Sequence, residues 1–430
     1  MFAKKKIEKN ESFRGTVTKQ FRKNKLAVIS FRFINFLFII ALLADILANE
    51  KPLVCSYKGR VYFPVFKSYA VDIGITDWQS DFQNISWKDC NYDWAVFPPI
   101  PYEPRNLDDN NIHSVSPFGE QNISSNRYRH WLGTDELGHD ILSALVHGTR
   151  IALFVGIVSM SIASFIGILL GSLAGYFGDD KLQISRARLW LNIIFLLPAY
   201  FYAFLSRAYI LSDAMGNSFG VFILQLFLSL FIFIFILFIG NILTPVFKKI
   251  KWLDAHISIH VDIIVSRIIE IMNSIPTLFL IISIVAIAKP SVFLVMAIIG
   301  LTTWTNIARF IRAELLRVRK LEYIEAAHAM GYSELRTLLR HAIPNAVSPV
   351  LIAVSFGIAN AILIESTLSF LGIGVPADTL TWGSLLSAAR QSPSAWWLGV
   401  FPGMAIFFTV TFYNLVGEGL TDAMDPRLRK

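Results

Sequence analysis

Long runs of apolar residues alternate with short polar segments along most of this chain. A helix needs roughly 20 predominantly apolar residues to cross about 30 Å of hydrocarbon, and eight of the runs are long enough to do so. They occupy residues 26–48, 151–174, 189–211, 219–243, 263–288, 291–307, 348–370 and a last run that ends at residue 419. The pattern predicts an all-α polytopic membrane protein with eight spans.

Glycine and proline indicate how two of these spans pack. Glycines recur along the second span, at Gly156, Gly167, Gly171 and Gly175. Small residues four apart let helix backbones approach closely in lipid, so we expect this span to lie in the interior of the helix bundle. Pro276 lies within the fifth span and is expected to kink it, because proline removes a helical hydrogen bond.

Composition supports the same class. Of 430 residues, 54% are hydrophobic and 16% are charged, whereas about 25% are charged in a typical soluble protein. The formal net charge of +8 would suit a nucleic-acid-binding protein, but the basic residues are not gathered into one patch. We therefore expect no nucleic-acid partner.

The sign of the charge changes along the chain and predicts its orientation. Residues 1–25 carry nine Lys or Arg and two Glu, whereas residues 49–145 carry eight Lys or Arg and thirteen Asp or Glu. By the positive-inside rule, the basic tail 1–25 is cytoplasmic and the segment 49–145 is outside. With eight spans both termini are then cytoplasmic, and the basic tail favours anionic membrane lipid.

The third and fourth spans read as a hairpin with an outer loop. The predicted loop 212–218 contains no Lys or Arg, which places it outside. Basic residues flank the hairpin at its other end, at Lys181, Arg186, Arg188, Lys248, Lys249 and Lys251.

The outer segment 49–145 is rich in proline and aromatic residues, and we expect a small folded insertion there. Cys55 and Cys90 both lie in it, and an exported segment permits a disulfide. Such a bridge would close a loop of roughly 35 residues and contribute on the order of 3 kcal/mol. Two free thiols are the alternative.

A polar segment separates the sixth and seventh spans. Residues 321–344 read LEYIEAAHAMGYSELRTLLRHAIP. Good helix formers fill 322–330, and Gly331 stands where a left-handed C-terminal cap would fall. Ser333 is a typical N-cap for a second short helix, which Pro344 is expected to end. Two short helices would therefore meet at a glycine elbow.

The surfaces of these two helices suit docking. On the first helix, Ala326, Ala327 and Ala329 leave a surface of low relief that a groove on another protein could approach closely. Leucines at 335, 338 and 339 recur on one face of the second helix. An amphipathic loop that lies on the membrane surface is the alternative.

Glu325-Ala326-Ala327, Gly331 and Pro344 resemble the EAA loop of bacterial ABC importer permeases, the segment that docks onto the ATPase subunit. Further blocks are similar to the second, or C-type, permease of the dipeptide/oligopeptide/nickel branch. These blocks are 130–140 (HWLGTDELGHD), 368–375 (LSFLGIGV), Trp382-Gly383 and 425–429 (DPRLR). The resemblance spans residues 26–430.

The resemblance implies an ABC importer type I permease core that works within a larger complex. Its partners would be a related permease that completes a heterodimeric pore, two ATPase subunits and a periplasmic substrate-binding protein. Glu325, Ala326, Ala327, Gly331 and Pro344 would form the ATPase-coupling loop. The implied location is the bacterial inner (plasma) membrane.

Two parts of the chain depart from the family pattern. The periplasmic insertion is longer than usual, and an extra transmembrane hairpin follows the second span. An added hairpin preserves the orientation of the later spans. The predicted divisions are a basic tail (1–25), the first span (26–48), the insertion (49–145), the second-span region (146–178), the extra hairpin (179–260) and the permease core (261–430).

Asn360 and Glu365 are the polar members of the seventh span, and a carboxylate within a membrane is a candidate for function. Glu365 matches a common family position near the outer end of that helix. We interpret both residues as pore or gate candidates, and for Glu365 we favour support of a gate or of packing over direct contact with the transported ligand.

The block 130–140 contains His130, Asp135, His139 and Asp140, residue types that bind metals. Because the block coincides with a family signature just before a span, we expect no metal there. The family more often has Arg at the position of His139, so a salt bridge made by that Arg is in doubt in this chain.

No G-x-x-x-x-G-K-[ST] phosphate loop occurs, so we expect no ATP hydrolysis by this chain and no cofactor. An ion-coupled secondary transporter is a rival hypothesis, but Glu365 is the sole candidate for the intramembrane acid or His residues that it would use. A membrane-embedded enzyme is another, but the block 130–140 lacks a nucleophile–base arrangement. Peptides, metal chelates, opines and peptide antibiotics all remain open as substrates.

Overall fold

The computed structural model describes residues 13–72, 74–79, 82, 86–88, 90–179, 182–217, 219–287, 289–376 and 379–424. The first part of the basic tail and the DPRLR block at 425–429 lie outside the described residues. The chain divides into two compact units, Met1–Val158 with Val354–Lys430, and Ser159–Ala353. Two helices, α5 (Ile141–Ser172) and α17 (Ser348–Phe370), each contribute residues to both units.

The first unit combines membrane-length helices with the insertion 49–145. Its other helices are α1 (Phe13–Lys23), α2 (Lys25–Leu42), α3 (Ala44–Leu47), α4 (Pro64–Asp72), η2 (Asn126–Tyr128), α18 (Trp382–Gln391) and α19 (Trp396–Met424). The insertion contains a small antiparallel sheet in the order β2-β1-β3, formed by β1 (Val54–Tyr57), β2 (Arg60–Tyr62) and β3 (Trp94–Val96). The insertion is therefore folded, as its proline and aromatic content predicted.

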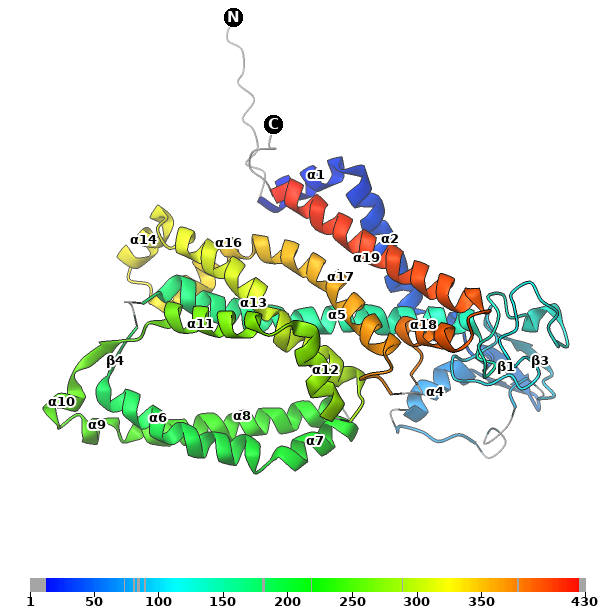
Figure 1. The fold of residues 1–430 in the computed structure, drawn as a ribbon, viewed down its shortest axis with the longest axis horizontal. Helices are drawn as coiled ribbons and strands as arrows, with labels where there is room; N and C mark the ends of the chain where they lie inside the picture. Colours follow the sequence, from blue (N-terminus) through cyan, green and yellow to red (C-terminus); the bar gives the residue numbers. More distant parts are fainter. Residues whose placement is uncertain are drawn as a thin grey trace, which may run out of the picture. The chain divides into compact units, whose positions relative to one another are not determined.

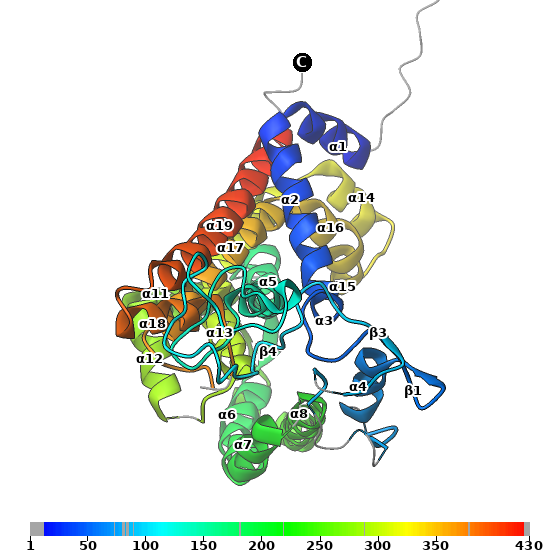
Figure 2. The ribbon, with the colours of Figure 1, turned by 90° about the vertical axis from the view of Figure 1, so that its right-hand side faces the viewer.

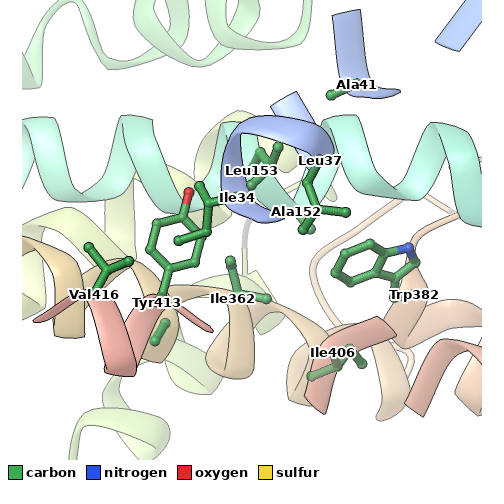
Figure 3. Packing of buried hydrophobic residues seen from close by; sticks show 11 residues of the cluster. Ile34, Leu37, Ala41, Ala152, Leu153, Ile362, Trp382, Ile406, Tyr413 and Val416 are labelled. Atoms are coloured by element: carbon green, nitrogen blue, oxygen red, sulfur yellow. The ribbon is translucent and has the colours of Figure 1, made fainter. Parts of the chain in front are cut away.

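The core of the first unit forms where α2, α5, α17, α18 and α19 meet. Ile34, Leu37 and Ala41 recur at helical spacing along α2 and are buried, so one face of that helix packs inward. Figure 3 shows these side chains beside residues of α5, α17 and α19 in one apolar layer. Trp382 of α18 belongs to the same layer, and its indole Nε1 donates a hydrogen bond to the Leu145 carbonyl oxygen at 3.1 Å.

The second unit contains the remaining elements. They are η3 (Leu173–Phe177), β4 (Gln183–Ser185), α6 (Arg186–Tyr200), η4 (Phe201–Leu205), α7 (Ala208–Asn217), α8 (Phe219–Ile242), α9 (Thr244–Phe247), α10 (Lys251–Asp254), β5 (His256–Ser258), α11 (Val261–Ser274), α12 (Thr277–Ile287), α13 (Val292–Val318), α14 (Glu322–Ala329), α15 (Glu334–Thr337), η5 (Leu338–Ala342) and α16 (Ile343–Ala346).

Close packing of α5 on α13 defines the core of the second unit. A Cβ atom added at Gly171 would lie 2.5 Å from the Ala308 carbonyl oxygen, and one added at Gly175 would lie 2.6 Å from the Arg312 carbonyl oxygen. Both distances are shorter than any real contact, so only glycine allows the two backbones to approach this closely. The close approach predicted from the glycine spacing is confirmed, but the span is not wholly interior within this chain, because Phe165 is 72% exposed and Leu169 is 50% exposed.

The extra hairpin consists of α6 and α7, which follow each other along one span, and of α8, which lies beside both (Figures 1 and 2). The antiparallel pair β4–β5 lies at its base and joins the two segments that connect it to the rest of the second unit. The predicted loop 212–218 is wrong, because α7 continues to Asn217 and α8 begins at Phe219. No proline interrupts residues 212–217, so the helical hydrogen bonds continue through them.

Arg207 links the two sides of the hairpin. Its guanidinium donates hydrogen bonds to Gln225 Oε1 at 2.6 Å and to Ser229 Oγ at 3.1 Å, both on α8. The hydrogen-bond donors of this charged side chain, which lies within an apolar span, are thereby paired inside the hairpin.

Among the described residues, seven helices are long and apolar enough to cross a membrane, and the pair α11–α12 forms an eighth span if it is counted as one. The bend of 79° between α11 and α12 falls at Ile275–Pro276, so the predicted kink at Pro276 is confirmed. The first span ends at Leu42 rather than at residue 48. After the single turn residue Leu43, the short helix α3 continues to Leu47, and its Asp45 pairs with Arg150 at 2.7 Å.

Candidate coupling loop and polar membrane residues

The helix α13 leads directly into the segment 321–344. It continues beyond the predicted end of its span, residue 307, to Val318, and its side chains Ile311, Leu315 and Val318 stay buried along this extension. The rigid helix therefore carries the chain to the start of α14 at Glu322.

A Schellman motif forms the elbow at Gly331. The Gly331 N–H donates to the His328 carbonyl oxygen at 2.9 Å, and the Tyr332 N–H donates to the Ala327 carbonyl oxygen at 3.1 Å. Gly331 has φ +80°, and its surroundings are open. The predicted left-handed cap is confirmed.

The second helix begins as predicted but does not end at Pro344. Ser333 is its N-cap, and its Oγ accepts a hydrogen bond from the Arg336 N–H at 3.4 Å. The π-helical turn η5 follows α15, and α16 then contains Pro344 in its first turn. A proline in a first turn removes no helical hydrogen bond, so the helical path continues past it.

The alanines of α14 do not share one surface. Ala326 and Ala329 are exposed, whereas Ala327 is buried together with Ile324. Since helix positions three apart share a face, Ile324 and Ala327 anchor α14 against the rest of the second unit. Glu325 lies on the exposed side. The predicted low-relief surface is thus confined to Ala326 and Ala329.

The exposed side of the segment carries large apolar side chains. Met330 is 66% exposed, Leu335 is 60% exposed and Leu339 is 58% exposed, whereas Leu338 faces inward. The predicted face of three leucines is therefore wrong in one member, because Leu338 packs into the unit. Several exposed large apolar residues within one short segment are typical of a surface that another protein covers.

Tyr176 contacts this segment, although no residue within 321–344 indicated that contact. Its hydroxyl shares a hydrogen bond of 3.2 Å with His328 Nε2, which also lies 3.7 Å from Glu334 Oε2. Tyr176 is buried in η3, directly after the glycine-rich part of α5. The segment 321–344 is thereby connected to the α5–α13 contact. The GYFGD sequence at 175–179, directly after the second span, was the available signal.

The two pore or gate candidates lie in different environments on α17. Asn360 is exposed, whereas Glu365 is buried and accepts hydrogen bonds from Ser369 Oγ at 2.7 Å and Ser366 Oγ at 3.4 Å. Gly383 at the start of α18 packs so closely that an added Cβ would lie 2.4 Å from the Ser366 carbonyl oxygen. Glu365 therefore belongs to a packed contact between α17 and α18.

The structure shows a polar face on α19 that was not predicted from the sequence. Thr411, Asn414 and Glu418 recur three and four residues apart, and with Phe356 of α17 they line a hollow of about 460 Å³. Asn414 and Glu418 are exposed. Their spacing in the sequence was a signal of one helix face.

The block 130–140 forms a buried polar cluster. His130 is fully buried, with Nδ1 2.9 Å from Asp140 Oδ2 and Nε2 3.0 Å from Asp108 Oδ2. Burial alone lowers the pKa of His130, but the hydrogen bonds and charges of Asp108 and Asp140 raise it above its usual range. The hydrogen bond from His130 lowers the pKa of Asp108 to about 2.

Within the part of the chain that the structure describes, no group of three or more His, Cys, Asp or Glu is arranged to hold a metal ion. His139 of the same block lies with Nδ1 2.7 Å from Asp135 Oδ2.

Cys55 and Cys90 are free thiols in the structure. Cys55 is buried in β1, and burial, with a smaller electrostatic contribution from the nearby Cys90, raises the pKa of Cys55 to about 11. The bridge stays a prediction. Mass mapping of oxidised, unreduced protein would find a linked pair if it forms, whereas full alkylation of both thiols would exclude it.

Two families match parts of the chain. Residues 252–430 match the family described as "Binding-protein-dependent transport system inner membrane component", and residues 12–58 match "N-terminal TM domain of oligopeptide transport permease C". The extra hairpin α6–α8 lies between the two matched regions.

Two curated relatives cover nearly the whole chain, and a third covers part of it. It is 27% identical over 411 residues to the inner membrane ABC transporter permease protein YejE of Escherichia coli (strain K12), which covers 95% of both chains. It is 25% identical to the peptidoglycan transport system permease protein YejE of Agrobacterium fabrum, across 95% of this chain and 91% of the relative. The oligopeptide transport system permease protein OppC of Salmonella typhimurium is 36% identical across 39% of this chain and 56% of its own length.

Proposed function

Because the chain belongs to the family of binding-protein-dependent transport system inner membrane components, as a multi-pass permease subunit of an ABC importer, we propose that it imports peptides or related small solutes. It would form one half of a heterodimeric pore with a related permease. The names of the relatives mention oligopeptide and peptidoglycan transport, which supports a substrate class that contains peptide bonds.

The permease is not itself catalytic, and a separate ATPase hydrolyses ATP. We propose that two ATPase subunits dock on the segment 321–344. The observation that carries this proposal is the exposed apolar surface of Met330, Leu335 and Leu339 beside the rigid elbow at Gly331. A partner that covers these side chains gains the free energy of apolar burial, about 25 cal/mol per Å².

The contacts inside the second unit offer a path for the motion. A displacement of α14 reaches Tyr176 through His328, and from η3 it reaches α13 through the glycine contacts of α5. Because backbones in direct contact move together, closure of the ATPase dimer would rock this helix pair as a body. The importer would thus alternate between inward-facing and outward-facing states, with a periplasmic binding protein delivering substrate.

The polar groups of the first unit would then divide into two roles. Exposed Asn and Glu side chains are costly toward lipid, so we place Asn360, Asn414 and Glu418 along the water-filled path or against the second permease. Glu365 would support the packing of α18 on α17, since its carboxylate is buried and hydrogen-bonded within the unit.

Association with the ATPase tests the docking proposal. In purified complexes, Leu335→Glu should weaken ATPase association at least about tenfold, which corresponds to roughly 1.4 kcal/mol. Leu107→Glu is the matched control, because Leu107 is 57% exposed and lies in the insertion. Equal association for both variants would argue against docking at this segment.

Uptake by reconstituted vesicles tests the importer. Complexes that contain the chain, its partner permease, the ATPase subunits and the binding protein should accumulate labelled oligopeptides when ATP is present. Uptake that follows an ion gradient without ATPase subunits would support the secondary transporter instead, and binding-protein ligands without peptide bonds would exclude the proposed substrate class.

A further inference from the structure

The helix α1 folds back beside the ends of α2 and α19. Figures 1 and 2 both show the three helices together at this end of the first unit. The junction is close, because a Cβ added at Gly419 of α19 would lie 2.2 Å from Ala27 Cβ of α2. Asn24, the N-cap of α2, also donates to Asp422 of α19 at 3.3 Å.

A groove of about 800 Å³ lies among these three helices. We call it the α1–α2–α19 groove. Its lining residues are Val17, Thr18, Phe21, Arg22, Val28, Phe31, Arg32, Val416 and Leu420. Apolar side chains from all three helices make up most of the wall, and the rings of Phe21 and Phe31 meet edge to face with centroids 6.3 Å apart.

Arg22 and Arg32 bring two positive charges to this apolar groove. Both side chains are exposed. Among the residues that the structure describes, no acidic side chain forms an ion pair with either guanidinium. A guanidinium in an apolar setting favours an anion, and its planar donors match the oxygens of a phosphate group.

The groove lies near the start of the first span, α2, at the level where the edge of a bilayer is expected. Arg22 precedes the apolar helix α2, whereas Arg32 lies seven residues after Lys25, about 10 Å along the helix. Arg32 can extend its guanidinium toward the headgroup level while its methylenes stay among apolar residues. Val28, Phe31, Val416 and Leu420 then lie beside the acyl region.

We propose that the α1–α2–α19 groove binds one anionic phospholipid. Its phosphate would be held by Arg22 and Arg32, and one acyl chain would lie along the apolar wall. A free phosphate would leave that wall uncovered, whereas a zwitterionic lipid would bring an additional positive charge next to the two arginines. The proposed orientation of the chain places this lipid in the cytoplasmic leaflet, although binding itself does not depend on that orientation.

Native mass spectrometry of the full-length, delipidated protein tests the site. Titration with phosphatidylglycerol should show one lipid bound more tightly than the rest, and phosphatidylcholine should bind about tenfold more weakly or less. The double variant Arg22→Gln/Arg32→Gln should lose at least about tenfold in affinity for the first phosphatidylglycerol.

The matched control is Lys23→Gln/Lys25→Gln, which removes the same charge from exposed residues that do not line the groove. It should retain the tight lipid. If both double variants lose binding equally, the attraction is diffuse surface charge and the site does not exist. If the first double variant cannot be purified, Arg32→Gln alone is compared with Lys25→Gln, and equal affinities would overturn the proposal.

Competition separates the possible anions. Inorganic phosphate or glycerol 3-phosphate at the concentration of the lipid should not displace phosphatidylglycerol, because neither covers the apolar wall. Displacement by either anion would show a headgroup-only site and would overturn the lipid assignment. This result is independent of uptake, so it distinguishes failure of the lipid site from failure of the importer proposal.

Discussion

Gly331 determines the angle between α14 and α15. It has φ +80°, and a side chain in this region costs roughly 1–2 kcal/mol. We predict that Gly331→Val inserts normally in the membrane but weakens ATPase association about tenfold, because relief of the strain would move the docking surface. Reconstituted complexes would be scored separately for assembly, ATPase rate and uptake.

Gly372 provides a matched control for this substitution. It also has positive φ, at +74°, and no atom lies within 4 Å of an added Cβ at either glycine. Gly372→Val therefore carries a similar backbone strain outside the coupling segment and should assemble and couple normally. Equal losses in the two variants would attribute the effect to general destabilisation, and parental uptake by Gly331→Val would contradict transmission through this elbow.

The buried cluster around His130 predicts a pH dependence of stability. The folded-state pKa of His130 is raised above its unfolded value by Asp108 and Asp140, with the Tyr102 ring stacked on the imidazole. The stabilisation is therefore fully present below about pH 6.5 and is lost as the pH rises through the raised folded-state pKa. The thermal midpoint of the wild type should fall between about pH 6 and about pH 9.

Two single variants distinguish the contribution of this cluster to the pH dependence of the thermal midpoint from the contributions of other titrating groups. His130→Gln should lower the midpoint at about pH 6 and flatten its dependence on pH, because the imidazolium between two carboxylates is absent. His113→Gln is the control, since His113 is exposed and lies 3.6 Å from Glu136 at the surface. An unchanged slope in His130→Gln would show that other groups cause the dependence.

At the scale of the element, the contact of α5 with α13 depends on the absence of side chains. We predict that Gly171→Ala destabilises the folded chain by about 1–3 kcal/mol, because the new methyl group would force the two backbones apart. Resistance of the full-length protein to unfolding by detergent measures this effect.

Gly399→Ala is the matched substitution for this element. Gly399 also lies in a membrane-length helix, α19, but an added Cβ there would meet Ala389 Cβ at an ordinary 3.8 Å. Alanine raises helix propensity at both positions, so a difference between the variants isolates the helix contact. Equal stability of the two variants would show that α5 can separate from α13 without cost.

At the scale of the whole molecule, the orientation in the membrane remains a prediction. The hairpin α6–α8 carries an uncharged run that lysines follow at 248, 249 and 251. We predict that a reporter fused at Met215 is periplasmic and that one fused at Lys251 is cytoplasmic. A cytoplasmic reporter at Met215 would show that the hairpin does not cross the membrane. A second reporter fused at Lys320 would then determine on which side of the membrane the coupling segment lies.

The sequence by itself determined the class of the elements, their order and the elbow of the coupling segment. Membrane helices follow from the length of apolar runs, and the Schellman motif at Gly331 follows from a few adjacent residues, so both depend on local chemistry. The family resemblance could be recognised for the same reason, because its motifs are short and continuous.

Only the tertiary structure decided which side chains face inward. Ala327 and Leu338 pack into the second unit although their neighbours are exposed, and Pro344 fits within a helical path because η5 precedes it. The Tyr176–His328 contact joins residues far apart in the chain. The α1–α2–α19 groove likewise exists because the two ends of the chain meet, and no local pattern specifies which distant segments will pack together.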